Sequence, residues 1–394
     1  MRKAKSQKKQ GFYRVNNSTW KSRCFLKDVS KYKTPDDYLI QIGGHKKSQK
    51  KNKNNQKRSS KKGKFNQKEQ QSGKIISRYV RSWFFFRKYE LSGLSKISGL
   101  VEFKPLKIND HVKWCRQQIK KYPNLEVISI LYKSDGLKIH GYLFKRKCNY
   151  SKKAVVIYCH GGNNHPKSRC VHLFDASFFY DQSLLPLVNE GKIVVFASNY
   201  RGNQNKQQIS EGVDEFCSRD INDTLNLYPI IKECKFSDSN KIGLVGWSRG
   251  CTTALLAHRE SNWSKCLVLG AGLYNLLATK KFRPVMYKIL KNKKYFNFTD
   301  KEMKERSALN WVNKLRPVPI LLLHGSADWR SPAEGSLEMG VQFLKYKIPY
   351  KLVIYPGGDH GLSEFKKERA KEIISHLEKY LVNQEKIDLT PHGY

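Results

Sequence analysis

The chain has 394 residues, of which 39% are hydrophobic and 12% aromatic, so it can bury a core and is not a wholly disordered protein. Its formal net charge of +42 is concentrated near the N-terminus, where residues 1–74 contain 23 Lys or Arg against four Asp or Glu. No segment has the ~18 consecutive apolar residues that cross a bilayer, and the basic N-terminus lacks the apolar run of a secretory signal.

The pattern of the nine cysteines indicates in which cellular compartment the protein resides. They include no C-x-x-C pair and no Cys/His spacing typical of zinc sites, and several lie in apolar runs, as Cys159 and Cys266 do. Reduced core thiols are typical of the cytosol. We therefore expect a cytoplasmic protein that needs no metal and no cofactor.

Residues 1–74 have the composition of a basic, largely disordered tail. Within them, residues 45–74 contain one large apolar side chain, Phe65, which is too little to offset the entropy lost on ordering. A coding bias toward lysine and asparagine explains the excess charge, or the tail has an affinity for polyanions. In the second case we expect weak, salt-sensitive binding to nucleic acid or anionic lipid without sequence preference.

Residues 75–124 are expected to form a helical extension that packs on the core. Apolar residues fall on one helical face within 75–89, and the arginines lie largely elsewhere. Such a basic amphipathic helix either docks on its own protein or lies on a membrane surface.

From residue 125 the sequence alternates between strands and helices. A hairpin is predicted over 125–146, with its turn at Ser134-Asp135-Gly136. Helix-length segments occur at 219–234, 332–347 and 364–383. Short continuous apolar runs, each typical of a buried parallel strand, lie at 154–159, 192–198, 241–247, 265–270, 319–325 and 350–356. This pattern predicts an α/β fold, a mostly parallel sheet covered by helices on both faces. The domain extends over 125–385, and 386–394 form a C-terminal tail.

The stretch Gly246-Trp247-Ser248-Arg249-Gly250 matches the pattern G-x-S-x-G. This spacing places a serine on a sharp turn from strand to helix, where only small neighbours at −2 and +2 avoid a clash. The flanking residues fit, because an apolar strand precedes the motif and a helical pattern follows it. Ser248 is therefore a candidate nucleophile.

An acid and a histidine follow Ser248 in the order that this turn requires. Asp328 comes after the strand at 319–325, and His360 comes after the strand at 350–356. The carboxyl ends of such strands are where open α/β sheets build their sites. We expect His360 to take the proton of Ser248, and Asp328 to fix the tautomer of the histidine.

Two backbone N–H groups are candidates for the oxyanion hole. One belongs to Arg249, directly after the nucleophile. The other comes from the glycines after the strand at 154–159, where we choose Gly162, with Asn163 as the alternative.

Several motifs together resemble the catalytic domain of prolyl-oligopeptidase-type serine hydrolases, in the α/β-hydrolase superfamily with its dienelactone-hydrolase-like relatives. They are HGG at 160–162, NYRG at 199–202, DEF at 214–216, GWSRG at 246–250, LHGSADWRSP at 323–332 and YPGGDHGLS at 355–363. The resemblance covers residues 125–385. It implies an acyl hydrolase with Ser248, Asp328 and His360 as its catalytic triad.

The chain departs from the family pattern in two places. Cys217 and Ser218 stand where members often carry glycines. The roughly 120 residues before the catalytic domain are also too few and too lysine-rich for the β-propeller of the oligopeptidases. Cleavage of small esters and cleavage of small peptide or amide bonds are therefore equal expectations. The alternative is a catalytically weak binding protein whose basic N-terminal region binds nucleic acid or an anionic membrane.

Residues around the triad have weaker assignments. Trp247, Trp329 and Arg330 are candidates for the substrate pocket, and residues 273–316 are the expected cap. Arg201 either binds a substrate carboxylate or forms a buried ion pair with Asp214 or Asp220. Asp359 is expected to cap backbone N–H groups rather than act as the triad acid. His324 and His172 are expected to be structural, since no partner pattern accompanies them.

Overall fold

The structure, a computed structural model, describes residues 94–107, 119–147, 151–162, 183–205 and 208–387. The chain divides into two units, Met1–Phe86 and Arg87–Tyr394, and every described residue belongs to the second unit. The predictions for residues 1–74 and 75–89 fall outside these ranges. In the ranges that are described, we find no helix with the length and apolar character needed to cross a membrane.

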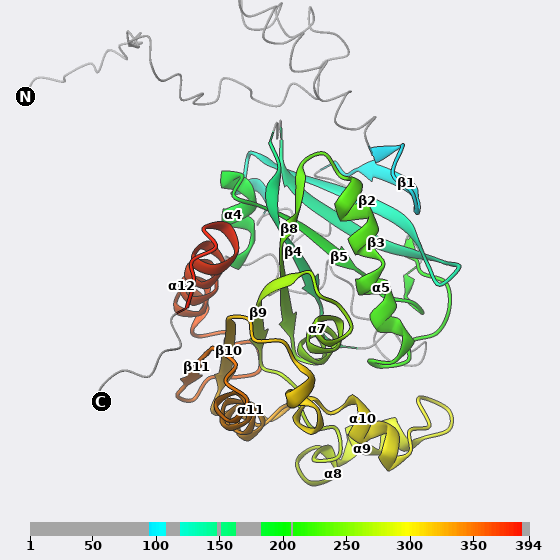
Figure 1. The fold of residues 1–394 in the computed structure, drawn as a ribbon. Coiled ribbons are helices and arrows are strands. Elements are labelled where there is room, and N and C mark those ends of the chain that lie inside the picture. Colours follow the sequence, from blue (N-terminus) through cyan, green and yellow to red (C-terminus); the bar gives the residue numbers. More distant parts are fainter. Residues whose placement is uncertain (1–93, 108–118, 148–150, 163–182, 206–207, 388–394) are drawn as a thin grey trace, which may run out of the picture. The chain divides into compact units, whose positions relative to one another are not determined.

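A nine-stranded sheet in the order β1-β2-β3-β5-β4-β8-β9-β10-β11 forms the centre of the second unit (Figure 1). From β5 to β11 all neighbouring strands are parallel, whereas β1, β2 and β3 pair antiparallel with one another and β3 pairs antiparallel with β5. The six predicted apolar strands are confirmed, and so is the α/β fold class. They are β4 (Lys153–Cys159), β5 (Ile193–Ser198), β8 (Ser237–Trp247), β9 (Ser264–Gly270), β10 (Ile320–Gly325) and β11 (Tyr350–Tyr355).

The predicted hairpin consists of β2 (Leu125–Ser134) and β3 (Leu137–Arg146). Asp135 and Gly136 connect them with φ values of 49° and 80°. Positive φ at both central residues is typical of a type I′ turn, whose twist matches that of the flanking strands. The register follows, with Ser134 opposite Leu137.

The helical extension predicted over 75–124 is wrong at Leu100–Pro105, which form a strand. Residues Leu100–Pro105 form β1, which pairs with β2 and places Phe103 opposite Ile130. The open edge of β2 offers hydrogen-bond partners to this segment, and its proline is tolerated at the end of an edge strand. Phe103 is partly buried against the core while Val101 and Lys104 are exposed.

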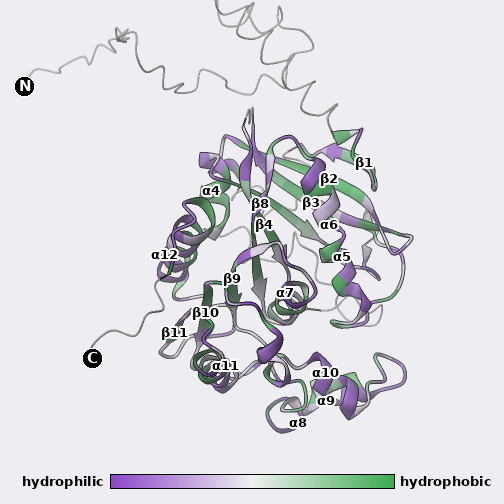
Figure 2. Cartoon of the chain, in the orientation of Figure 1, coloured by the Kyte–Doolittle hydropathy of each residue, from purple (hydrophilic) through white to green (hydrophobic). Residues whose placement is uncertain are grey.

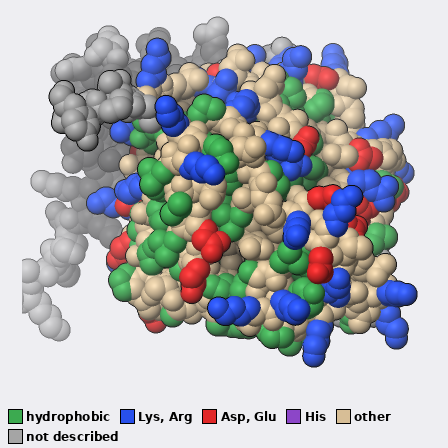
Figure 3. Space-filling view, turned by 60° about the horizontal axis from the view of Figure 1, so that its bottom comes forward, with side chains coloured by type: hydrophobic (Ala, Val, Ile, Leu, Met, Phe, Trp, Pro, Cys, Tyr) green, Lys and Arg blue, Asp and Glu red, His purple; other side chains and the backbone are tan. Residues whose placement is uncertain are grey.

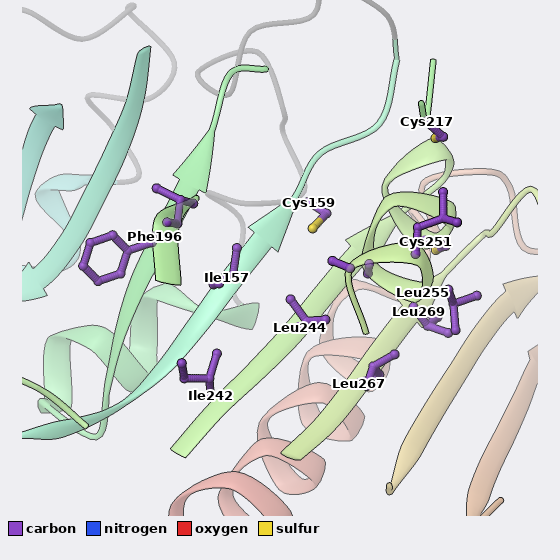
Figure 4. Packing of buried hydrophobic residues seen from close by; sticks show 14 of the residues in the cluster. Ile157, Cys159, Phe196, Cys217, Ile242, Leu244, Cys251, Leu255, Leu267 and Leu269 are labelled. Carbon is purple, nitrogen blue, oxygen red and sulfur yellow. The ribbon is translucent and has the colours of Figure 1, made fainter. Parts of the chain in front are cut away.

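Helices cover both faces of the sheet, each over its own hydrophobic cluster. On one face pack α4 (Leu185–Glu190) and α12 (Lys366–Leu377), which continues as a π-helix over Glu378–Val382. On the other pack α6 (Leu227–Glu233), α7 (Arg249–Arg259) and α11 (Glu334–Lys345). Figure 4 shows residues of the second cluster, with Leu255 from α7 and Leu244, Leu267 and Leu269 from the strands β8 and β9.

Residues 273–316 contain three further α-helices, α8 (Thr279–Phe282), α9 (Pro284–Lys291) and α10 (Asp300–Arg306). In Figure 1 they lie at the end of the sheet toward which the parallel strands run. Their buried side chains, including Met286, Leu290 and Met303, join the cluster beneath α7. Figure 2 shows hydrophobic central strands and many hydrophilic residues on these helices. The expected cap is therefore anchored on the domain and is polar outside.

Candidate active site

Ser248 occupies a strained turn between β8 and α7. Its φ of 57° and ψ of −123° lie outside the regions that L-residues ordinarily adopt. Such strain costs about 1–3 kcal/mol and persists where the surrounding structure enforces it, most often at functional sites. The predicted turn from strand to helix is thus present, with the serine at its apex.

Gly250 is required by a close backbone approach at the same turn. A Cβ atom at this position would overlap the carbonyl oxygen of Cys159 at the end of β4. We expect Gly250→Ala to lower the free energy of unfolding by roughly 1–3 kcal/mol, because neither backbone can yield without moving the turn. Urea denaturation measures this loss.

Gly335 in α11 provides the matched control. A Cβ atom there would meet nothing closer than 3.6 Å, and alanine is the better helix former. Gly335→Ala should therefore leave the protein as stable or more stable. Equal stability of the two alanine variants would show that the contact at Gly250 is not tight.

Asp328 and His360 are brought together from the ends of β10 and β11. His360 Nδ1 lies 2.7 Å from Asp328 Oδ2. The other carboxylate oxygen, Oδ1, accepts hydrogen bonds from the N–H groups of Arg330 and Ser331 at 2.9 and 3.0 Å. Burial by itself would raise the pKa of Asp328, but these hydrogen bonds, with those from two histidines, hold it well below its usual range. Asp328 is therefore ionised at neutral pH.

The second of these histidines is His324, for which the sequence showed no partner. Its Nε2 lies 2.6 Å from the carbonyl oxygen of Ser331 and 3.3 Å from Asp328 Oδ2, and its Nδ1 lies 2.6 Å from Ser336 Oγ. Because Nε2 faces two acceptors, it carries the hydrogen. His324 is fully buried and helps to hold Asp328. Its place four residues before Asp328 was the only signal in the sequence, and His172 lies outside the described residues.

Trp247 connects the histidine loop to the strand that precedes Ser248. Its Nε1 donates a hydrogen bond of 3.0 Å to the carbonyl oxygen of His360. The side chain is only 6% exposed and belongs to the core, so it positions the loop more than it lines a pocket.

Within the described residues, the Ser248 hydroxyl and the His360 imidazole are not hydrogen bonded to each other.

The side chain of Arg249 is buried beneath the turn. Nη1 and Nη2 donate to the two carboxylate oxygens of Asp214, both at 2.7 Å, and Nη2 also contacts Asp220. Nη1 donates to the carbonyl oxygen of Gly162 as well, at 3.0 Å. Burial alone would lower the pKa of Arg249, but the two carboxylates raise it. One guanidinium thus joins the residue after Ser248 to the Gly161-Gly162 segment.

The predicted partners of Arg201 are wrong. Its Nη2 donates at 2.8 Å to Asp223 Oδ1 and to Asp135 Oδ2, which lies in the β2–β3 turn. Asp214 and Asp220 are already engaged by Arg249, which approaches them from the start of α7. The expected ion pair of Arg201 therefore exists, with different carboxylates.

Asp359 has the expected capping geometry, and the conformation of Cys217 bears on one departure from the family pattern. Asp359 accepts hydrogen bonds from the N–H groups of Gly361 and Ser363 at 3.0 and 2.7 Å, so it caps its own loop. Cys217 has a φ of 67°, a conformation that glycine adopts most easily. Its N–H donates to Asp220 at 3.1 Å, which helps to hold a cysteine in that conformation.

Comparison with known proteins gives one family. Residues 177–384 match the sequence profile of the prolyl oligopeptidase family. The uncharacterized peptidase YuxL of Bacillus subtilis is 22% identical over 236 residues, which cover 58% of this chain and 34% of that protein.

Solved structures of peptidases share the fold. The acylaminoacyl peptidase of Pyrococcus horikoshii has a TM-score of 0.56 at 20% identity, over 69% of this chain and 44% of that one. An acylaminoacyl peptidase in complex with Z-Gly-Gly-Phe-chloromethyl ketone has a TM-score of 0.57 at 21% identity, over 71% and 45%. The chain thus spans about a third to less than half of the length of these relatives.

Proposed function

Because the chain belongs to the prolyl oligopeptidase family of serine peptidases, we propose that it cleaves small ester or peptide bonds through an acyl-enzyme formed on Ser248. The observation that carries this proposal is the 2.7 Å contact between His360 Nδ1 and Asp328. It lies in the same domain as a serine whose backbone is held at a φ of 57°.

His360 acts as the base and then as the acid. Since its Nδ1 donates to Asp328, the lone pair of Nε2 is available to accept the proton of Ser248. Ser248 Oγ then bonds to the carbonyl carbon of the substrate, and His360 returns the proton to the leaving amine or alcohol. Water hydrolyses the acyl-enzyme by the same two steps. The ionised Asp328 stabilises the imidazolium in each of them.

The backbone N–H groups of Arg249 and Gly162 donate hydrogen bonds to the substrate oxygen, which becomes negatively charged during the reaction. Arg249 is the first residue of α7, so the positive end of the helix dipole adds to its N–H group. The hydrogen bond from the Arg249 side chain to Gly162 supports the other half of the hole. Asn163, the alternative donor, lies outside the described residues.

The position of the cap supports the proposal that the substrates are small. Met286, Leu290 and Met303 of this segment are buried in the core cluster, so the cap is packed on the domain. One solved relative holds a short peptide derivative, Z-Gly-Gly-Phe-chloromethyl ketone. We propose that both esters and amides of this size are substrates.

The alternative, a catalytically weak binding protein, has less support. A binding protein gains nothing from a strained serine or from a paired aspartate and histidine. Weak polyanion binding by residues 1–74 stays a prediction, because those residues lie outside the described ranges. A cytoplasmic location is likewise proposed, from the cysteine pattern of the sequence alone.

Substrate profiling tests the proposal. We expect p-nitrophenyl esters of short acids, aminoacyl p-nitroanilides or both to be cleaved, and an intact folded protein to survive. A fluorophosphonate probe should label the folded chain. Efficient digestion of the intact protein would refute the size limit, and a folded chain that resists labelling would refute the serine mechanism.

A further inference from the structure

Trp329, directly after Asp328, is unusually exposed for its residue type. It is 67% exposed, whereas Trp247, Trp263 and Trp311 are at most 8% exposed. Tryptophan has a large ring with little conformational freedom, and it is enriched where proteins contact ligands. Trp329 belongs to the same loop as Asp328, which contacts His360, so this exposed ring is carried by the loop of the proposed triad acid.

Two arginines place their guanidinium groups over this ring. Arg283 comes from the junction of α8 and α9 in the cap, and its guanidinium carbon is 5.6 Å from the ring centroid. Arg330 comes from the Asp328 loop and is 5.3 Å from the same centroid. The cap and the loop of the proposed triad acid therefore meet at one aromatic side chain.

Neither guanidinium group has a hydrogen-bond acceptor among the residues that the structure describes. Within the described ranges, only the side chains of Arg283 and Arg330 make neither a hydrogen bond nor a salt bridge. The other described arginines all have such a partner; they are Arg146, Arg201, Arg219, Arg249, Arg259, Arg306, Arg316 and Arg369. Asp328 is near but does not serve as a partner, because backbone N–H groups and histidines already engage both of its oxygens.

The pair of like charges carries an electrostatic cost in the unliganded protein. Arg283 is partly buried, and its burial and the charge of Arg330 lower its pKa, while the charge of Asp328 opposes this shift without cancelling it. A guanidinium has five donors in a fixed fork that matches a carboxylate. An anion between the two arginines would satisfy these donors and remove the repulsion.

We propose that Arg283 and Arg330 form an anion subsite over Trp329, and that it selects substrates carrying a carboxylate close to the scissile bond. The inference rests on the proposed function and names its substrate class. The carboxylate belongs either to the acyl part, as in an acidic side chain, or to the leaving part, as in the free C-terminus of a peptide.

Matched substrate pairs test both sources. For the acyl side, mono-p-nitrophenyl glutarate is compared with p-nitrophenyl valerate. For the leaving side, alanyl-alanine is compared with its C-terminal amide. We expect kcat/KM to favour the anionic member of at least one pair by roughly 10–100-fold, the range of a charge-assisted hydrogen bond. The pair that shows the preference identifies the source of the carboxylate.

Variants connect the preference to the two arginines. Arg283→Met and Arg330→Met should each bring the anionic-to-neutral ratio toward 1, and Arg283→Glu should turn it below 1. Lys281→Met is the matched control. It removes the same charge from an exposed position of the cap, and among the described residues Lys281 makes no cation–π contact with Trp329. Because Lys and Arg side chains are scattered over the face in Figure 3, this control separates a local subsite from general attraction.

A binding measurement keeps the inference testable apart from turnover. Calorimetric titration of the Ser248→Ala protein compares N-acetylglutamate with N-acetylglutamine, and the same titration is repeated after adding Arg283→Met. Stronger binding of the acid, lost with Arg283→Met, supports the subsite even if no hydrolysis is detected. If the neutral substrates are cleaved, no pair shows a preference and the two ligands bind alike, the subsite is refuted while the proposed function stands.

Discussion

Replacing Ser248 by alanine is expected to lower the rate of ester hydrolysis by on the order of 10⁴–10⁶, as loss of a triad member does in related enzymes. Without the hydroxyl no acyl-enzyme forms, and the remaining N–H donors only polarise the substrate. Fluorophosphonate labelling should disappear as well. The fold should be unaffected, because alanine and serine both have a Cβ atom and are equally strained at the φ of 57° that this turn requires.

Ser261→Ala is the matched control for this experiment. Ser261 lies just beyond the other end of α7, where its hydroxyl donates to the carbonyl oxygen of Ala257 at 2.6 Å. Replacing Ser261 by alanine removes a hydroxyl group, as Ser248→Ala does, but far from the carboxyl ends of the strands, where the proposed catalytic residues lie. The control should keep both labelling and hydrolysis. Persistent labelling of the Ser248→Ala protein would place the nucleophile elsewhere and would overturn the proposed mechanism.

Much of the fold is predictable from sequence because its strands are buried on both faces. Fully buried strands need continuous apolar residues, so runs such as IVVFAS at Ile193–Ser198 stand out without further context. The order of serine, acid and histidine is equally visible, since each residue lies at the end of such a run or in the loop that follows it. The 2.7 Å contact between Asp328 and His360 agrees with that order.

The ion pairs beneath the site could not be predicted in the same way. Arg249 meets carboxylates that are 35 and 29 residues away in the chain, and Arg201 meets one that is 66 residues away. Which arginine reaches which aspartate depends on how the loops cross after the strands are assembled, and no local pattern records that. Strand β1 was missed for a related reason, since its pairing comes from the free edge of β2.

Replacing Arg249 by methionine is expected to lower the free energy of unfolding by roughly 3–5 kcal/mol, the usual cost of removing one partner from a buried ion pair. Asp214 and Asp220, whose side chains are fully buried, would lose the guanidinium that pairs with them. The rings of Tyr200 and Phe216, which contact the guanidinium at 5.3 and 4.7 Å, would also lose a favourable cation–π contact. The midpoint and slope of urea denaturation measure the loss.

Arg249→Lys separates stability from catalysis. A lysine keeps the positive charge but presents a single ammonium group, which cannot reproduce the planar fork that contacts two aspartates and the carbonyl oxygen of Gly162. The Gly162 segment would then lose its support, and we expect kcat to fall by roughly 10–100-fold with little change in KM, because the oxyanion forms only after substrate is bound.

Arg201→Lys is the control, since Arg201 also binds two carboxylates, Asp135 and Asp223. Among the described residues, its side chain makes no hydrogen bond to Arg249 or to Gly161-Gly162. Both lysine variants should be less stable than the parent. Only the variant at position 249, assayed where it is fully folded, should lose kcat. Equal losses of kcat in the two variants would mean that Arg249 supports the fold alone, and that the oxyanion hole is positioned by other contacts.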